Sequence, residues 1–145
     1  MTYRCEAAKP HDLGRALELL REAHLPERGV VEQFGHFLVV RDDAQVIGVC
    51  GVEVLGDLGM LRSVAVDPSY RESGVGDCLV RGALDLASKT LHLNAVYLLT
   101  TTAERYFERY GFHSVPRDEA PEPIRTSWEF QTGCPQTAVL MKRAL

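Results

Sequence analysis

Hydrophobic residues in the first part of the chain recur at a spacing that predicts a helix between short elements. One set has members three or four residues apart, as on a single helix face: Leu13, Ala16, Leu17, Leu20 and Ala23. Pro10 suits the first turn of a helix, so we expect this helix from about residue 10 to His24. A short strand is expected before it, over residues 3–7, and a short second helix after it, over residues 30–34.

The middle of the chain predicts a hairpin, a third strand and a long helix. Residues 37–41 and 46–55 are apolar runs on either side of the turn sequence Asp42-Asp43-Ala44-Gln45. Because the run 46–55 is apolar on both alternating faces, it predicts a central strand covered on both sides. A further buried strand is expected over residues 59–66, and a helix over about 74–91. This helix has one apolar stripe, formed by Leu79, Val80, Ala83, Leu84, Ala87 and Leu91.

The last third continues the alternation of strands and helices. Residues 95–99 form a continuous apolar strand, followed by a helix that Gly111 ends. One face of that helix carries Ala103, Tyr106, Phe107 and Tyr110. Strands are expected over 112–116 and 137–143, with one or two helical turns between them over 121–131. The pattern predicts a single α/β domain over residues 1–145, with a mixed sheet and helices on both faces.

Composition narrows the function classes. The chain has 145 residues, of which 46% are hydrophobic and 25% charged, and a net charge of −4. Without a run of Lys or Arg, neither a nucleic-acid groove nor a membrane-seeking face is expected. Residues 1–10 do not resemble a signal peptide, and no apolar stretch has the length of a membrane span. The cysteines are far apart, which argues against zinc and disulfides: Cys5, Cys50, Cys78 and Cys134. We therefore expect a reduced, cytoplasmic protein without a metal.

The loop after the third strand carries the most specific chemical pattern. It runs Val64-Ala65-Val66-Asp67-Pro68-Ser69-Tyr70-Arg71-Glu72-Ser73-Gly74-Val75-Gly76, a buried strand that leads through a glycine loop into a helix. Backbone N–H groups at such a helix start can converge on an anion, and glycine lets the backbone approach it closely. A diphosphate would fit. A tight turn with no ligand is the alternative, and no P-loop is present because Gly-Lys-Ser/Thr does not follow.

Two motifs resemble those of the GNAT acetyltransferase superfamily. Arg71-x-x-Gly74-x-Gly76 after Val64-Ala65-Val66-x-Pro68 resembles its pyrophosphate-binding motif. Ala103-x-x-Tyr106-Phe107-x-x-x-Gly111-Phe112 resembles the motif that follows its fifth strand. The resemblance implies the GNAT fold, a single mixed, mostly antiparallel sheet with splayed central strands. It also implies acetyl-CoA-dependent transfer of an acetyl group to an amine.

Three further segments resemble a narrower group. Residues 61–66, 98–103 and 134–141 resemble the arsenic-resistance N-acetyltransferases, and the middle one also resembles the acetyltransferase domain of N-acetylglutamate synthases. This implies a small amino-acid-like amine, for which we expect an acidic character. A homodimer is a further expectation, and no nucleic-acid or membrane partner is expected.

The resemblance implies a coenzyme site on the third strand, the loop and Phe107. The backbone of Val64, Ala65 and Val66 would pair with the pantetheine arm, and the Val64 amide would hold the thioester carbonyl, as an oxyanion hole does. The diphosphate would lie on one run of residues: Arg71, Glu72, Ser73, Gly74, Val75, Gly76 and Asp77. The acidic side chains of Glu72 and Asp77 depart from the usual composition and would weaken binding unless they point away.

The residues that handle protons depart from the family pattern. Phe107 stands where many GNAT enzymes have a tyrosine acid, and Tyr106 should face about 100° away, toward the core. Thr101, Thr102 or water could then protonate the leaving thiolate. Met60 occupies the usual position of a glutamate base. Glu53 is the best substitute because it alternates with apolar residues on one strand face, although a solvated strand end is the alternative.

Arg62 is the expected anchor for an anionic acceptor. Strand alternation places it on one face with Met60 and Val64, and a guanidinium there suits a carboxylate, phosphonate or arsonate. The alternative is an internal salt bridge with Glu53. Arg117 and Arg125 are weaker candidates. Because the tyrosine acid and the glutamate base are missing, a non-catalytic acetyl-CoA-binding sensor or partner protein remains the second hypothesis for function.

Overall fold

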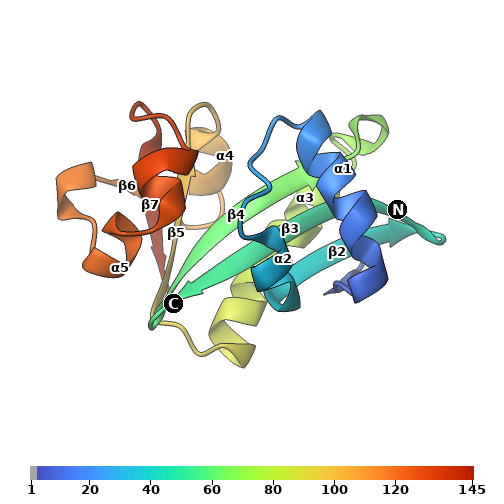
Figure 1. The fold of residues 1–145 in the computed structure, drawn as a ribbon, viewed down its shortest axis with the longest axis horizontal. Helices are drawn as coiled ribbons and strands as arrows, with labels where there is room; N and C mark the ends of the chain where they lie inside the picture. Colours follow the sequence, from blue (N-terminus) through green and yellow to red (C-terminus); the bar gives the residue numbers. More distant parts are fainter. Residues whose placement is uncertain (1–2) are drawn as a thin grey trace. The chain divides into compact units, whose positions relative to one another are not determined.

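The computed structural model describes residues 3–145 as seven strands and five α-helices joined by short turns. The strands lie in one sheet in the order β1-β2-β3-β4-β5-β7-β6. Their bounds are β1 Cys5–Ala7, β2 Phe37–Asp42, β3 Gln45–Leu55, β4 Leu58–Val66, β5 Ala95–Thr100, β6 His113–Val115 and β7 Val139–Ala144. The helices are α1 Leu13–Glu22, α2 Val30–Gln33, α3 Val75–Asp85, α4 Glu104–Glu108 and α5 Glu122–Arg125 (Figure 1).

These elements confirm the α/β class and the predicted order, with small shifts at the ends. The first helix begins with a 3₁₀ turn, Pro10–Asp12, before α1. The long helix expected to about residue 91 is α-helical only to Asp85 and then continues as a π-helical turn, Leu86–Thr90. β1 pairs antiparallel with β2, β2 with β3, β5 with β7 and β6 with β7, whereas β4 and β5 run parallel.

The chain divides into two compact units, which are described separately. The first unit comprises the residues up to 53 together with 61–86, and the second comprises 54–60 together with 87–145. In the first unit α1 and α2 lie in front of β2 and β3, and α3 lies behind them (Figure 1). Helices therefore cover both faces of this part of the sheet, as predicted.

Two glycines let α3 pack closely against the strands of the first unit. A Cβ added at Gly48 would lie 2.6 Å from Val75 Cγ1, and one added at Gly82 would lie 2.7 Å from Cys5 Sγ. Both distances are shorter than real Cβ contacts, so a side chain at either position would force its neighbour to shift. The close packing fixes α3, and with it the loop that precedes α3, against β3.

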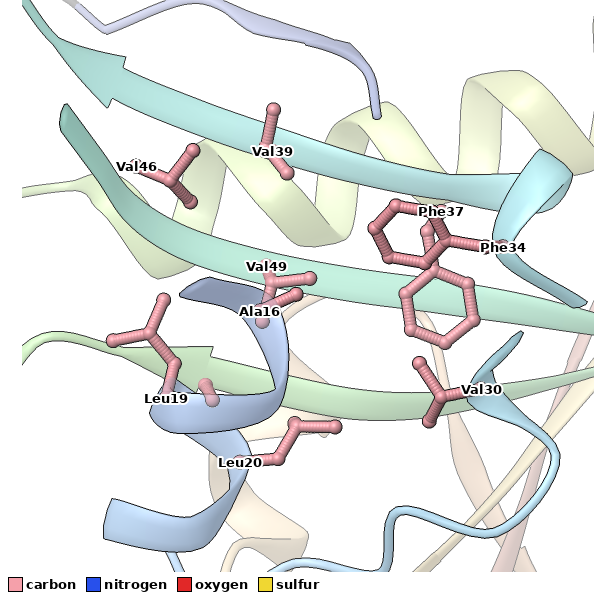
Figure 2. Close-up of a cluster of buried hydrophobic side chains, with 10 residues drawn as sticks. Ala16, Leu19, Leu20, Val30, Phe34, Phe37, Val39, Val46 and Val49 are labelled. Atoms are coloured by element: carbon pink, nitrogen blue, oxygen red, sulfur yellow. The ribbon is translucent and has the colours of Figure 1, made fainter. Parts of the chain in front are cut away.

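The other face of the first unit buries a core of aliphatic and aromatic side chains (Figure 2). Leu19 and Leu20 of α1 and Val30 of α2 are at most 1% exposed. The rings of Phe34 and Phe37 lie 5.4 Å apart between centroids. Because each buried Leu, Val or Phe side chain contributes about 1.5–3 kcal/mol, this cluster holds the short helix α2 onto the sheet.

An irregular backbone conformation in β4 overturns one prediction about side-chain direction. Ser63 has φ +61°, a left-handed conformation that interrupts the alternation of the strand. Arg62 contacts the segment between α1 and α2, and Ala65 packs in the core beneath the same helices. Ala65 rather than Val64 therefore shares a face with Arg62, and the prediction that assigned Val64 to that face was wrong.

The second unit has its own sheet pairing and core. β7 pairs antiparallel with β5 along Val139–Ala144 and with β6. The parallel pairing joins Leu58, Gly59 and Met60 of β4 to Ala95, Val96 and Tyr97 of β5. Its core contains Met60, Tyr97, Ile124 and Leu140. The expected excursion over 121–131 forms α5 and a π-helical turn, Glu129–Gly133.

Candidate functional site

The glycine loop joins β4 to α3 through two residues in the left-handed region. A 3₁₀ turn, Pro68–Tyr70, follows β4, after which Glu72 has φ +62° and Gly74 has φ +97°. Residues 71–74 are exposed, whereas Val75 at the start of α3 is fully buried. The loop is thus anchored at its helical end and open to solvent along its length.

Gly74 is required for its backbone conformation and leaves room beside it. An added Cβ would meet no atom within 4 Å, so only its φ of +97° disfavours other residues. Gly74 is the N-cap of α3, and Val75, Gly76 and Asp77 form its first turn. The N–H groups of a first helical turn have no helical acceptor and carry partial positive charge. This open helix start fits an anionic group such as a diphosphate.

Of the two acidic residues in the expected diphosphate-binding run, Glu72 and Asp77, one is paired with an arginine. Asp77 accepts hydrogen bonds from Arg81 Nε at 3.0 and 3.1 Å, a pair four residues apart along α3. The carboxylate therefore lies along the helix beside a positive charge. Glu72 is exposed. The carboxylate of Asp77 should therefore repel a bound diphosphate less than an unpaired carboxylate would.

Two side-chain contacts tie the turn before the loop to the body of the first unit. Arg15 of α1 donates to Asp67 at 2.6 Å, and the Tyr70 hydroxyl donates to Asp42 at 2.5 Å. The Ser69 N–H and Arg15 both favour the charged form of Asp67 and lower the pKa of its carboxyl group. The hydrogen bond to Asp42 raises the pKa of Tyr70 to about 12, so its phenol stays protonated at neutral pH.

Arg62 and Glu53 lie together in the first unit. Arg62 Nη1 donates to Glu53 Oε1 at 2.9 Å, and their side chains are only 6% and 14% exposed. Arg62 also donates to the Arg28 carbonyl at 2.6 Å and to the Ser63 hydroxyl at 3.1 Å. The structure thus contains the internal salt bridge that the sequence left as the alternative. Glu53 is not at a solvated strand end.

The guanidinium of Arg62 also lies close to the backbone where α2 begins. Gly29 has φ +81°, and a Cβ added there would lie 3.0 Å from Arg62 Nη1 and 3.9 Å from Glu53 Oε1. The segment between α1 and α2 is therefore held directly on this ion pair. Any anion that replaced Glu53 on Arg62 would meet the same short segment.

The candidate residues of the second unit lie in and near α4. Thr101 and Thr102 are exposed, and Phe107 is half-buried. Tyr106 is half-buried too, so the prediction that it belongs to the core was wrong. Its ring packs edge-on against Phe107 and lies 4.7 Å beneath the Arg109 guanidinium.

The late arginines and Cys134 have structural surroundings. Arg117 donates to the carbonyls of Ala138 and Phe130 at 2.9 and 3.2 Å, and Arg125 donates to the Ala120 carbonyl at 3.0 Å. These contacts occupy both arginines within the second unit. Cys134 is half-buried.

Sequence reasoning missed the residues that hold the candidate site in place. Arg15, Asp42 and the Arg28 carbonyl lie far along the chain from their partners, and no local pattern marks them. A weak signal exists for Asp67, since Asp before Pro-Ser is a common turn start that accepts from the backbone two residues on. Within residues 3–145 no group of three or more His, Cys, Asp or Glu residues is placed to hold a metal ion. No helix in the described part is long and apolar enough to cross a membrane.

Amino-acid acetyltransferases are among the curated proteins similar in sequence. The one from Buchnera aphidicola subsp. Acyrthosiphon pisum is 29% identical, over 87% of this chain and 30% of its own length. That from Azotobacter vinelandii is 28% identical, over 83% of this chain and again 30% of its own length. The chain thus spans about a third of the length of these relatives.

Solved structures match nearly the whole chain. N-acetylglutamate synthase from Neisseria gonorrhoeae, complexed with coenzyme A and N-acetyl-glutamate, superposes with a TM-score of 0.84 at 19% identity, covering 100% of this chain and 35% of the synthase. Rv2747 from Mycobacterium tuberculosis, in complex with CoA and NLQ, gives a TM-score of 0.84 at 25% identity, covering 97% and 98%. The acetyltransferase (GNAT) domain model matches residues 33–114, which include the whole glycine loop and the start of α3. The chain belongs to the GNAT acetyltransferase family and is related to the acetyltransferase domains of N-acetylglutamate synthases.

Proposed function

We propose that the chain is an acetyl-CoA-dependent N-acetyltransferase for a small, acidic, amino-acid-like amine. The observation that carries the proposal is the open start of α3 behind Gly74, inside the segment that matches the GNAT domain. CoA complexes of proteins with the same fold support acetyl-CoA as the donor. The names of the amino-acid acetyltransferases support an amino-acid-like acceptor.

The coenzyme would be held by the backbone of residues 64–66 and 71–77. It supplies an activated acetyl thioester. The acceptor's amine nitrogen forms the new C–N bond while the C–S bond breaks, so no nucleophilic Ser or Cys is required. The acceptor ammonium first gives up a proton, for which Glu53 is our candidate. As the amide forms, the nitrogen would lose its second proton, and the departing thiolate would take up one proton by way of water.

The Arg62–Glu53 pair supports an acidic acceptor. A buried guanidinium requires an anionic partner, and Glu53 fills that role here. An acceptor carboxylate could share or replace this partner, since a planar guanidinium binds carboxylates in pairs of parallel hydrogen bonds. Glu53 would then be free to take the ammonium proton. An arsonate or phosphonate offers the same oxygen geometry, which keeps arsenical amino acids among the proposed acceptors.

The test is thiol release from acetyl-CoA with matched acceptors: glutamate, glutamine, aspartate, asparagine and an arsenical amino acid. We expect turnover with the acidic members, and Arg62→Leu should raise KM for glutamate about tenfold or more above its effect on glutamine. The variant Gly74→Val should lose CoA binding in calorimetry, because valine disfavours φ near +97°.

Three outcomes would contradict parts of the proposal. CoA binding without thiol release for any acceptor would favour the sensor hypothesis. Equal effects of Arg62→Leu on glutamate and glutamine, together with a lowered unfolding midpoint, would make Arg62 structural. Arg62→Lys keeps the charge and serves as the variant if the leucine does not fold. Unchanged CoA affinity of Gly74→Val would refute the assignment of the loop.

A further inference from the structure

Two side-chain pairs outside the glycine loop hold the turn from which the loop starts. One joins Arg15 to Asp67 and the other joins Asp42 to Tyr70. We propose that these four residues are positioning residues that set the affinity for the diphosphate of the coenzyme. The inference rests on the proposed function, because it assumes that the loop binds a diphosphate.

Tyr70 connects β2 to the loop. It ends the 3₁₀ turn, and its hydroxyl donates to Asp42, the last residue of β2 and 28 positions earlier in the chain. The Tyr70 carbonyl in turn accepts a hydrogen bond from the Ser73 hydroxyl, next to Gly74. Hydrogen bonds therefore run from the edge of the hairpin to the residue before the N-cap of α3.

Arg15 connects the sheet and α1 to the same turn. Its Nε donates to the Val46 carbonyl of β3 at 3.0 Å, and its Nη2 donates to Asp67 Oδ2 at 2.6 Å. The other oxygen of Asp67 accepts from the Ser69 N–H at 2.9 Å, and the Asp67 N–H donates to the Ile47 carbonyl at 2.8 Å. The turn is thus held at its first residue by the backbone of β3 and by a guanidinium that is itself held by β3.

Packing of α3 anchors the loop at its helical end, and the two pairs support its other end, where the loop leaves β4. Residues 71–74 are exposed, and two of them have left-handed backbone angles. Left-handed conformations of residues other than glycine, such as Glu72, persist only where the surroundings enforce them. If the supports are removed, the loop spends less time in the binding conformation. The apparent Kd then rises in inverse proportion to the fraction that remains in the binding conformation.

Two conservative variants and a control test the inference. Tyr70→Phe removes one hydroxyl, and Asp67→Asn removes the charge while retaining an oxygen for Ser69. Arg21→Gln is the matched control. It breaks an exposed ion pair, away from the loop, between Glu27 and Arg21 of α1, the helix that also carries Arg15. CoA affinity is measured by calorimetry. KM and kcat are measured with acetyl-CoA and with S-acetyl-N-acetylcysteamine, a donor without a diphosphate.

Each of the two variants should raise the Kd for CoA and the KM for acetyl-CoA by about three- to tenfold, as expected for the loss of one hydrogen bond of ordinary strength. Their kcat values should stay within about twofold of the parent, because the reacting atoms are not touched. The loss should vanish with the short donor, and Asp42→Asn should add little to Tyr70→Phe in a double-mutant cycle. The control should bind CoA as the parent does.

Parent-like CoA affinity in both variants would overturn the inference. An equal rise in KM with acetyl-CoA and with the short donor would also overturn it, because a merely structural role predicts that result. If Asp67→Asn does not fold, Tyr70→Phe decides alone, since it removes only the hydroxyl oxygen of Tyr70. Gly74→Val separates the two levels of failure. If it abolishes CoA binding while Tyr70→Phe has no effect, only the inference fails. If it too leaves CoA binding unchanged, the proposed function fails with it.

Discussion

The two units of the molecule use arginine in different ways. In the described part of the first unit arginines pair with carboxylates: Arg15 with Asp67, Arg21 with Glu27, Arg41 with Asp12, Arg62 with Glu53 and Arg81 with Asp77. In the second unit three arginines donate to backbone carbonyls: Arg117, Arg125 and Arg143. A carboxylate partner titrates and can be exchanged for a ligand anion, whereas a carbonyl partner can do neither. The glycine loop and Arg62, the candidate anchor for the acceptor, both lie in the first unit, where the partners of the arginines are carboxylates.

The largest effect is expected from Asp12→Ala. The Asp12 side chain is 2% exposed and accepts from both Nη atoms of Arg41 at 2.7 Å and from the Lys9 N–H at 2.8 Å. Its removal leaves a partly buried guanidinium without its main partner, so the free energy of unfolding should fall by about 3–5 kcal/mol. Urea unfolding at pH 7 measures it. Glu6→Gln, which changes the half-exposed second partner of Arg41, should cost at most about 1 kcal/mol. Equal losses of stability in Asp12→Ala and Glu6→Gln would contradict the expectation that the buried carboxylate is the main partner of Arg41.

A smaller loss is expected from Arg117→Met in the second unit. The variant keeps most of the aliphatic stem but removes hydrogen bonds to two carbonyls and the guanidinium that lies 4.4 Å over Phe130. We expect the free energy of unfolding to fall by about 1–3 kcal/mol, measured by the same urea titration. Arg117→Lys should recover little, because an ammonium lacks the planar fork. A loss as large as that of Asp12→Ala would show that carbonyl partners stabilise arginine as strongly as carboxylates do.

The smallest effect is a difference in acid sensitivity. The hydrogen bond from Arg41 lowers the pKa of Asp12, and that from the Ser69 N–H lowers the pKa of Asp67. The unfolded chain, whose aspartates titrate near pH 3.9, then binds more protons than the folded chain in acid. Their contribution to stability is therefore complete above about pH 4 and is lost as the pH falls through the lower folded pKa values.

Urea midpoints of the parent, Asp12→Asn and Arg117→Met at pH 7, 4 and 3 test this difference. The Asp12→Asn profile should be flatter than that of the parent below about pH 4, because one of the shifted carboxyl groups is gone. The Arg117→Met profile should run parallel to that of the parent, since carbonyls do not titrate. A flattened profile for Arg117→Met would contradict the division between the units.

The sequence by itself determined the elements and the glycine loop. Hydrophobic periodicity placed α1, β3 and α3 because each element buries its own stripe, and burial depends on local spacing. Gly74 could be assigned to the helix start because its requirement, a positive φ, is local as well. The family pattern around it was readable for the same reason.

Only the tertiary structure decided how the side chains around that loop are partnered. The left-handed Ser63 turns Ala65, not Val64, to the face of Arg62, which simple alternation cannot foresee. Tyr106 is half-buried, and Arg62 meets Glu53 and the Arg28 carbonyl through the approach of separate segments. Arg15 and Asp67 are 52 positions apart, and Tyr70 and Asp42 are 28 apart. Such contacts depend on how strands and helices pack together, and local spacing carries no information about partners that only packing brings within reach.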